Sequence, residues 1–449
     1  MNSHALVKDS WLSHLDARVP RYTSYPTAPH FSPEIDGSAY ANWLGALSPQ
    51  TRLSLYLHVP FCRDICWYCG CHTIATRKDA PVLDYAAALS AEIELAAGAT
   101  AAREVHSIHW GGGTPNILTP SAFADLVAAL DRAFDLSSVD EHSIEIDPRS
   151  LTPAHVEAFA AAGVTRASLG VQDLNDHVQR AIGRVQPFEV VARAVALLRA
   201  GGIARINLDL MYGLPNQTIE DARRTAELAA DLAPDRLAAF GYAHVPWFKT
   251  RQRLIEEPDL PGADVRFDQA ETMRAALARC GYAAIGFDHF ARNGDALATA
   301  AQTGALTRSF QGYEADAADA LLAFGASAIS TLPQGYAQNA TDVKAWARAI
   351  REGHFATIRG IAVSQEDCTR RRIIEALLCA FDVDLAEFGG FAAYPGAADA
   401  LAPLAADGLV AIEGERVRVT AEGRPFARLA AQAFDAYRPI GQARHSRAV

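Results

Sequence analysis

The feature that most constrains the fold is a regular alternation of short β-rich segments and amphipathic helical segments, which begins at Leu53. The β-rich segments fall at residues 53–59, 105–110, 143–146, 166–171, 206–211 and 237–243. Helical patterns, several opened by proline, fall between them at 84–97, 120–134, 153–162, 187–200 and 219–231. This order is typical of a parallel sheet with crossover helices. It predicts an α/β fold whose six βα units form either a full small barrel or an open barrel with a lateral mouth.

The chemically unusual residues stand at or just after the ends of these predicted strands. They are a cysteine loop, the GGGTP run at 111–115, Glu145, Asp147, Gln172, Asp209 with YGLP, and Ala243 with His244. In parallel barrels the functional groups gather at the carboxyl ends of the strands. The sequence therefore predicts one site at that edge of the sheet.

The cysteine loop follows the first predicted strand in the stretch LSLYLHVPFCRDICWYCGC. Cys62, Cys66 and Cys69 could bind three irons of a cuboidal iron-sulfur cluster and leave the fourth iron open for chemistry. A zinc knuckle with Cys71 or His72 as fourth ligand is the alternative. A disulfide is disfavoured, because four thiols within ten residues would close very small loops.

The glycine run at 111–115 has two interpretations. Glycines let a ligand approach the main chain, because no Cβ blocks it. A tight barrel turn would need the same residues. Its position after the second strand of a barrel whose first strand ends in the cysteine loop favours ligand binding.

Composition limits the class of protein. With 449 residues and no long run of strongly apolar residues, the chain predicts a globular protein of two or three domains without a membrane span. The first residues lack an apolar signal-peptide core, so we expect a cytoplasmic protein. A net charge of -11 argues against nonspecific nucleic-acid binding. Cys280, Cys368 and Cys379 are far from the loop and are expected to be small core residues.

Regions outside the alternation have a different character. Residues 1–50 contain PRYTSYPTAPHFSPEI and predict an extended arm, which either wraps the surface or caps the site, with a short helix at 40–47. No architecture is predicted for 246–359.

From about 361 a helical pattern with two short strands around Glu413 and Gly414 resembles a winged helix, for which we expect a packing or lid role. The predicted division is an arm at 1–50, a catalytic barrel with its extension at 51–359, and a helical domain at 360–449.

The motifs together resemble those of the radical S-adenosylmethionine (SAM) superfamily, and within it the oxygen-independent coproporphyrinogen III oxidases of haem biosynthesis. The resemblance runs from about Pro20 to the C-terminal helix. It is carried by PRYTSYPTA, YLHVPFC, CWYCGC, GGGTPNILTP, SIEIDPR, LGVQDLN, NLDLMYGLPNQT, GYAHVPW, GFDHFAR, FQGY and YAQN. The implied fold is a partial (β/α)6 radical SAM barrel with an extended N-terminal arm and a mainly helical, winged-helix-like C-terminal domain.

The resemblance also implies an activity. Cys62, Cys66 and Cys69 would ligate a 4Fe-4S cluster, and reductive cleavage of SAM would give a 5'-deoxyadenosyl radical. The ring A and B propionates of coproporphyrinogen III would become vinyl groups, giving protoporphyrinogen IX. An electron donor and an electron acceptor are needed, the sequence identifies neither, and a monomer is expected. The alternative is a haem-binding or haem-delivery relative without this activity; the PRYTSYPT arm and Cys71 favour the enzyme.

The family pattern implies two SAM molecules. Contacts to the first fall on Tyr56, Gly112, Glu145 and Ile329. Contacts to the second fall on Tyr68, Gly113, Thr114, Gln172, Arg184, Asp209 and Ala243. Carboxylates such as Glu145 can accept hydrogen bonds from ribose hydroxyls, and Arg184 can bind a carboxylate with two parallel bonds. The alternative for Glu145 and Asp209 is that each forms an ion pair with an arginine at the barrel rim.

Two further positions in the loop, Tyr68 and Cys71, have features beyond cluster ligation. Residue 68 is tyrosine where the family usually has phenylalanine, so an aromatic face is kept but a hydroxyl is added. Cys71 is expected to be catalytic, in a redox, proton-transfer or substrate-side role, against the alternative of a buried thiol. For the four substrate carboxylates the candidates are Arg21, Tyr22, His289, Arg292 and the run Arg370, Arg371 and Arg372, although such a run is usually a solvated helix face.

Overall fold

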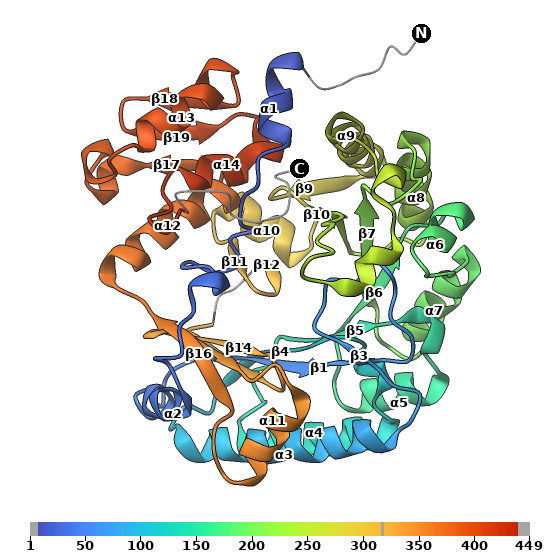
Figure 1. The fold of residues 1–449 in the computed structure, drawn as a ribbon. Coiled ribbons are helices and arrows are strands. Elements are labelled where there is room, and N and C mark those ends of the chain that lie inside the picture. Colours follow the sequence, from blue (N-terminus) through green and yellow to red (C-terminus); the bar gives the residue numbers. More distant parts are fainter. Residues whose placement is uncertain (1–7, 316–317, 439–449) are drawn as a thin grey trace.

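The fold is built on one large sheet, seen in a computed structural model that describes residues 8–315 and 318–438 (Figure 1). Its strand order is β16-β15-β14-β13-β1-β4-β5-β6-β7-β8-β10-β9. The six predicted strands are β1 (Leu53–Val59), β4 (Val105–Gly112), β5 (Glu141–Ile146), β6 (Arg166–Gln172), β7 (Arg205–Tyr212) and β8 (Arg236–Gly241). They pair in parallel in chain order, as predicted.

A seventh parallel strand, β13 (Ala320–Phe324), pairs with the other side of β1 and was not predicted. Its sequence ALLAF is buried throughout, which suits a strand covered on both faces. Among the described residues the sheet ends at β16 on one side and β9 on the other, so it does not close. The α/β fold and the open form of the barrel are therefore confirmed.

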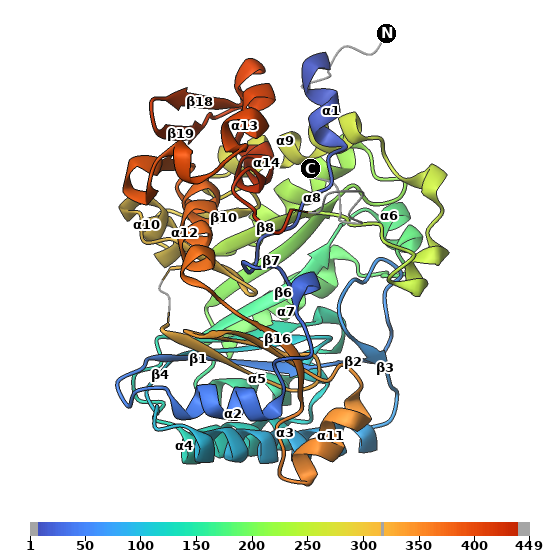
Figure 2. The same ribbon diagram turned by 60° about the vertical axis from the view of Figure 1, so that its left-hand side comes forward.

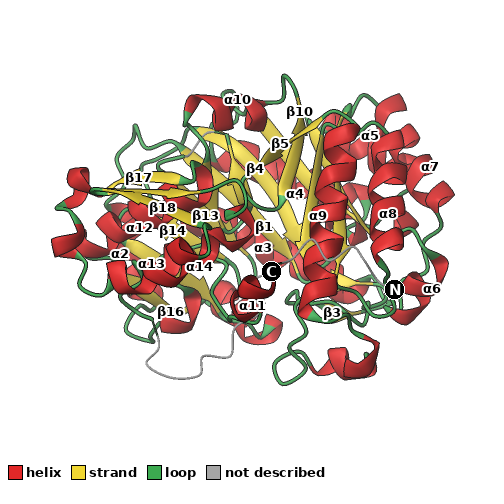
Figure 3. Ribbon diagram, turned by 90° about the horizontal axis from the view of Figure 1, so that it is seen from above, coloured by secondary structure: helices red, strands yellow, loops and turns green. Residues whose placement is uncertain are grey.

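The crossover helices cover the outer face of the sheet (Figure 3). They are α3 (Ala80–Ala99), α4 (Pro120–Ala133), α5 (Pro153–Ala161), α6 (Asp176–Ala181), α7 (Phe188–Ala200) and α8 (Ile219–Asp231). The starts of α4, α5 and α8 are set by Thr119, Thr152 and Thr218, whose hydroxyls accept from main-chain N–H groups of the first turn. α3 begins four residues before the predicted start, with a proline in its first turn.

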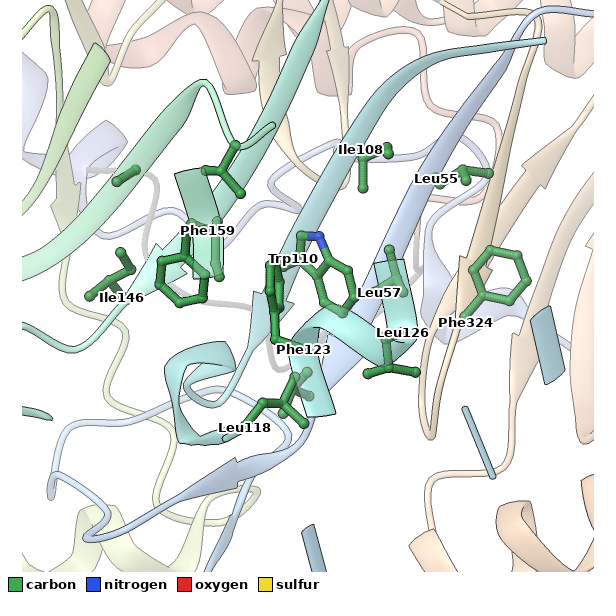
Figure 4. Close-up of a cluster of buried hydrophobic side chains, with 14 of the residues drawn as sticks. Leu55, Leu57, Ile108, Trp110, Leu118, Phe123, Leu126, Ile146, Phe159 and Phe324 are labelled. Carbon is green, nitrogen blue, oxygen red and sulfur yellow. The ribbon is translucent and has the colours of Figure 1, made fainter. Parts of the chain in front are cut away.

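Large side chains fill the space between the sheet and these helices (Figure 4). Trp110 of β4 lies 4.8 Å from Phe123 of α4, measured between ring centroids, and Phe123 lies 4.8 Å from Phe159 of α5. All three are fully buried. Such aromatic side chains each bury a large apolar area, so they fix α4 and α5 on the sheet and hold the strand ends in register.

The stretch without a predicted architecture extends the sheet on both sides. β9 (Tyr282–Ile285) and β10 (His289–Arg292) add antiparallel strands beyond β8, and β14 (Ile329–Leu332), β15 (Gly335–Asn339) and β16 (Thr357–Ala362) add them beyond β13. The remaining elements are α9 (Ala263–Arg279), α10 (Ala296–Thr303), α11 (Val343–Arg351) and the hairpin β11 (Thr307–Ser309) and β12 (Gly312–Glu314). Near the cysteine loop lies the short pair β2 (Phe61–Cys62) and β3 (Ile74–Ala75).

The C-terminal part forms a separate lobe with its own hydrophobic core. It contains α12 (Gln365–Cys379), β17 (Asp382–Asp384), α13 (Ala397–Ala406), β18 (Val410–Glu413), β19 (Arg416–Val419) and α14 (Ala427–Gln432). The predicted hairpin is β18 and β19, and β17 adds a third strand.

The N-terminal arm packs on this lobe. It contains α1 (Leu12–Leu15) and α2 (Gly37–Gly45), and α1 lies beside the lobe (Figure 2). Trp11 is buried, with its ring centroid 6.0 Å from that of Phe267 of α9 and 5.8 Å from that of Phe426. The arm therefore joins the lobe to the barrel.

Candidate active site

The carboxyl ends of the parallel strands open on a cavity of about 590 Å³, called the strand-end cavity below. All but two of the predicted site residues line it. The predicted residues that line the cavity are Cys62, Cys66, Tyr68, Cys69, Cys71, Gly112, Gly113, Thr114, Glu145, Gln172, Arg184, Asp209 and Ala243. The strand order brings these residues together, because they lie in or after the carboxyl-terminal parts of neighbouring parallel strands.

The other two, Tyr56 and Ile329, do not line the cavity. Tyr56 of β1 stacks on His109 with ring centroids 5.7 Å apart, and its hydroxyl donates to Nδ1 of His58 over 3.0 Å. A Cβ on Gly111 would lie 3.0 Å from the Tyr56 ring, so Tyr56 lies directly behind the glycine run. Ile329 begins β14, half-buried, and pairs with Gln338.

Hydrogen-bond donors surround the thiols of the cysteine loop. Thr73 Oγ1 donates to Cys62 Sγ over 3.3 Å, and Arg184 Nη1 donates to Cys66 Sγ over 3.4 Å. Thr114 Oγ1 also lies 3.3 Å from Cys62 Sγ. Hydrogen bonds to sulfur and nearby positive charge stabilise thiolates and set cluster potentials.

Cys69 and Cys71 form a hydrogen-bonded pair with opposite shifts in pKa. The hydrogen bond from the Cys71 thiol lowers the pKa of Cys69 to about 6, although burial works in the other direction. The same bond raises the pKa of Cys71 well above its usual value. Lys249 adds positive charge near Cys69, and its Nζ donates to the main-chain oxygen of Cys71 over 3.1 Å. Of these two thiols, Cys69 is therefore the one that ionises more readily, and Cys71 the one that keeps its proton.

The three thiols fit a cluster better than a single metal ion. Cys62, Cys66 and Cys69 are free cysteines on one cavity wall, each with a donor or a cation beside it. Within residues 8–315 and 318–438, no three His, Cys, Asp or Glu side chains are close enough to hold one ion. His72, a candidate fourth zinc ligand, donates from Nε2 to the Thr341 carbonyl over 2.7 Å. With a volume of about 590 Å³, the cavity has room for a group larger than one ion.

The glycine run exposes main chain to the cavity. Gly112 has φ of 118°, where L side chains are strained, and a Cβ there would lie 2.7 Å from the His58 ring. At Gly113 a Cβ would lie 2.5 Å from Thr73 Oγ1. Burial lowers the pKa of His58 to about 4, so the ring is neutral; its Nε2 donates to the His72 carbonyl over 3.1 Å. The positions of both glycines are therefore set by the packing behind them.

Two carboxylates line the cavity on different strands. Glu145 accepts from the main-chain N–H of Gly112 over 3.1 Å and from His109 Nε2 over 3.3 Å. Asp209 accepts from Ser168 Oγ over 2.9 Å and from Asn207 Nδ2 over 3.0 Å. Burial, followed by the charge of Glu145, raises the pKa of Asp209 to about 6. The oxygens of both carboxyl groups can accept hydrogen bonds from hydroxyl groups.

Several contributors were not predicted. Arg149 pairs with Asp147 and lies 3.9 Å from Cys66 Sγ, Ser168 holds Asp209, and Lys249 lies at the rim. Arg149 stands within the SIEIDPR motif, and Lys249 follows GYAHVPW, so motif position was a usable signal for both. Nothing in the sequence singles out Ser168, which depends on the pairing of β6 with β7.

The candidates for substrate carboxylates are dispersed. Arg21 lines the strand-end cavity, and His289 lines an inner cavity of about 540 Å³ that shares Glu145 and Asp209 with it. The other five candidates lie elsewhere. Tyr22 is buried and donates to Asp435, and Arg292 donates to the Tyr282 hydroxyl. In α12, Arg370 donates to the Phe434 carbonyl, Arg371 lines a separate cavity, and Arg372 stacks on Phe388. Arg21 and His289 are the candidates that the fold brings near the predicted site.

Comparison with known proteins identifies the family. A model of the radical SAM superfamily matches residues 56–229, and a model of the HemN C-terminal domain matches residues 363–426. The oxygen-independent coproporphyrinogen III oxidase of Bradyrhizobium diazoefficiens is 48% identical over 447 residues, covering 98% of this chain and 99% of that protein. The chain belongs to the oxygen-independent coproporphyrinogen III oxidases.

Other oxygen-independent coproporphyrinogen III oxidases are similar over nearly their whole length. The protein of Paracoccus denitrificans is 45% identical over 444 residues, covering 98% of both chains, and that of Escherichia coli 41% over 424 residues, covering 93% of both. A solved structure described as coproporphyrinogen III oxidase (HemN) from Escherichia coli, a radical SAM enzyme, superposes with a TM-score of 0.88 at 38% identity. It covers 94% of this chain and 100% of that one.

Membership has direct consequences for cofactors. As a radical SAM oxidoreductase the chain uses a 4Fe-4S cluster and SAM, which agrees with the free thiols and donors of the strand-end cavity. Across the part of the chain that the structure describes, none of the helices has both the length and the apolar character needed to cross a membrane.

Proposed function

We propose that the chain catalyses the anaerobic oxidative decarboxylation of the ring A and B propionates of coproporphyrinogen III, giving protoporphyrinogen IX. The observation that carries the proposal is the strand-end cavity, where three free thiols, an exposed glycine main chain and two carboxylates face one space. The oxygen-independent coproporphyrinogen III oxidases that cover the whole chain support the substrate.

When bound, the cluster and SAM supply one-electron chemistry that removes a hydrogen atom from the β-carbon of a propionate. Each propionate then loses its carboxyl group as carbon dioxide and passes one electron to an acceptor, which leaves a vinyl group. The electron donor and acceptor are separate partners whose identity the chain does not reveal.

The protein's own residues hold and tune these groups. Cys62, Cys66 and Cys69 would ligate the cluster, and the donors Thr73 and Arg184 would stabilise its sulfurs. Because Arg184 contacts Cys66 on one nitrogen and the Gly170 carbonyl on another, its guanidinium is fixed in place before any ligand binds.

Two SAM molecules are proposed to bind. The first would contact Tyr56, Gly112, Glu145 and Ile329. The second would contact Tyr68, Gly113, Thr114, Gln172, Arg184, Asp209 and Ala243. The support is that Glu145 and Asp209 are separate acceptors on β5 and β7, so each can serve a different ribose.

Cys71 is proposed as a proton-transfer or redox residue. Its thiol keeps its proton, shares it with Cys69 and lies at the exposed side of the loop. Replacing Cys71 with serine should leave cluster content and SAM cleavage in place while product formation falls; loss of the cluster would instead make Cys71 a structural residue.

We further propose that the chain is a cytoplasmic monomer divided into an arm at 1–50, a catalytic unit at 51–359 and a helical domain at 360–449. The separate hydrophobic cores of the barrel and the C-terminal lobe support the second boundary. The arm shares the lobe's core, so it would act together with it.

The deciding experiment is an anaerobic assay of the reconstituted protein with SAM, reductant, an electron acceptor and coproporphyrinogen III. We expect the divinyl product together with methionine and 5'-deoxyadenosine. SAM cleavage without decarboxylation would contradict the proposal, and stable haem binding instead would identify a haem-delivery relative.

A further inference from the structure

We propose that a second, basic cavity lined by Arg21, Arg266 and Arg428 binds the carboxylate of a propionate that is not reacting, and so orients the tetracarboxylate substrate. It is called the arginine cavity below. This inference rests on the proposed function for the identity of the substrate.

The arginine cavity lies at the ends of β7 and β8, where the barrel, α9, the arm and the C-terminal lobe meet. Its volume is about 60 Å³. That is room for a few water molecules or a carboxylate group and far too little for a tetrapyrrole ring. A ligand would therefore enter it with one side chain only.

The arginine cavity adjoins the strand-end cavity. The two cavities share a short wall, which is formed by Arg21, Phe240, Gly241 and Tyr242. Arg21 Nη2 donates to the Gly241 carbonyl over 3.2 Å, which places its guanidinium at the shared rim. A ring held near the cofactors could thus extend a propionate across this rim.

Arg266 is buried in the cavity wall and held by the main chain. Its Nη1 donates to the Tyr242 carbonyl over 2.9 Å. A Cβ on Gly213 would lie 2.6 Å from Nη1, and a Cβ on Gly241 would lie 3.1 Å from Nη2. Glycine at these two positions makes room for the guanidinium.

Arg428 reaches the same cavity from α14 of the C-terminal lobe. It is buried, and its guanidinium lies 5.7 Å from the centroid of the Phe287 ring. Burial, followed by the positive charge of Arg21, lowers the pKa of Arg428 to about 10, so it stays charged at neutral pH. An anion between Arg21 and Arg428 would be attracted by both.

The acidic groups in the wall, Asp288 and Glu271, are fewer than the arginines, and the charge of Asp288 also acts on Arg21 and Arg428. Asp288 accepts from His289 Nδ1 over 2.6 Å and faces Arg308 at 3.8 Å, and Glu271 pairs with Arg274. The wall is thus basic in a chain whose net charge is -11. Guanidinium groups bind carboxylates through paired, charge-assisted hydrogen bonds, so the ligand class that fits is a carboxylate.

The test is equilibrium binding of coproporphyrin III, the stable aromatic form of the tetracarboxylate, to the cluster-loaded protein. For Arg428→Met and Arg21→Met we expect Kd to rise roughly tenfold or more, as for loss of a charged hydrogen bond. The tetramethyl ester should bind the wild type and both variants equally. Arg279→Met is the matched control, because Arg279 ends the same helix as Arg266 and is exposed beside Glu227.

Each outcome bears on one proposal. Unchanged Kd for the tetraacid, or an equal loss for acid and ester, would overturn the arginine cavity as a carboxylate site. Since Arg21 is exposed, Arg21→Met tests the site even if Arg428→Met fails to fold, which thermal unfolding followed by circular dichroism reports. A wild type that binds coproporphyrin III but does not decarboxylate its substrate would refute the proposed function and leave this site standing.

Discussion

The strand-end cavity and the arginine cavity share part of one wall but are built in different ways. The first is made by residues that follow successive parallel strands, so the order of the sheet alone brings them together. The second needs Arg21, Arg266 and Arg428, from the arm, α9 and α14, which meet only when the C-terminal lobe packs on the barrel. The two cavities should therefore fail independently, one with the sheet edge and the other with the lobe.

Cys66→Ser is expected to have the largest effect on the strand-end cavity while leaving the arginine cavity intact. Removing this thiol should abolish the cluster and reduce decarboxylation to background, because only two of the three proposed ligands, Cys62 and Cys69, remain. Coproporphyrin III binding should persist, since the arginine cavity does not involve the loop. Iron content and porphyrin Kd are the measurements. Cys280→Ser is the control, because Cys280 is far from the loop and is exposed at the end of α9 rather than in the core as predicted. Loss of porphyrin binding along with the cluster would show that the two cavities do not fail independently.

Trp11→Ala addresses the other cavity. Truncating a buried tryptophan between Phe267 and Phe426 should lower the free energy of unfolding by about 3–5 kcal/mol. We expect weaker porphyrin binding with normal iron content, because the arm and lobe loosen while the sheet edge stays formed. Thermal unfolding and porphyrin titration test this. Trp247→Ala, at a partly exposed tryptophan, should have little effect; a variant that loses its cluster would contradict the prediction.

Glu92 allows the packing of α3 against the ends of β13 and β15 to be tested by pH. It is buried in α3 and accepts from the Gly325 N–H over 2.6 Å and from Asn339 Nδ2 over 2.7 Å. Burial raises its pKa to about 7 from the usual 4.5. The folded state therefore holds a proton that the unfolded state releases between these values, and stability should fall by about 3 kcal/mol as pH rises from 4.5 to 7.

Glu92→Gln should flatten that part of the pH profile, because glutamine does not titrate. The midpoint of thermal unfolding measured at several pH values checks this, with the exposed Glu94→Gln as control. An identical fall in the variant would assign the pH dependence to other groups.

Asp209→Asn should have a smaller effect, on SAM alone. The carboxylate form accepts from hydroxyls and is populated above about pH 6, so SAM affinity of the wild type should drop below that pH. In the variant we expect roughly tenfold weaker binding at neutral pH and no such drop. Calorimetric titration with SAM measures both, and Asp231→Asn at the exposed end of α8 is the control. A wild-type affinity independent of pH would exclude Asp209 as the acceptor.

Tyr68→Phe should change least. The ring packs beside a small apolar cluster that includes Val178 and Ile182, which phenylalanine can reproduce. The substitution keeps the ring on the wall of the strand-end cavity and removes only the hydroxyl. SAM affinity should stay within about twofold. Tyr68→Ala, which removes the ring, provides the contrast, and a Phe variant as weak as the Ala variant would show that the hydroxyl matters.

The sequence predicts the fold well where local pattern and topology agree. The six strands and the helices between them have strong periodic patterns and capping residues such as Thr218. β13 was missed because a run of five apolar residues fits a buried strand or a helix segment equally, and no βα spacing leads to it. The antiparallel strands beyond it carry no repeating order.

The same reasoning explains what was predictable in the site. Cysteine spacing and strand-end position indicate the residues of the strand-end cavity, because both are local properties of the chain. Arg266 and Arg428 could not be predicted, since an arginine on a helix is usually solvated and only the packing of distant segments buries these two. Tyr22 and Arg370, singled out for their chemistry, instead contact residues of the C-terminal lobe.

The position of β13 also bears on how the chain is made. β1 carries the cysteine loop and lies between β4 and β13, with Leu53 opposite Ala320 in the register. During synthesis β1 can pair with β4 early, but its other edge stays open until residue 320 has left the ribosome. Exposed strand edges invite pairing with other chains, and contacts between distant residues form slowly. A nascent or truncated chain that ends before β13 therefore presents the strand of its cysteine loop as an unprotected edge.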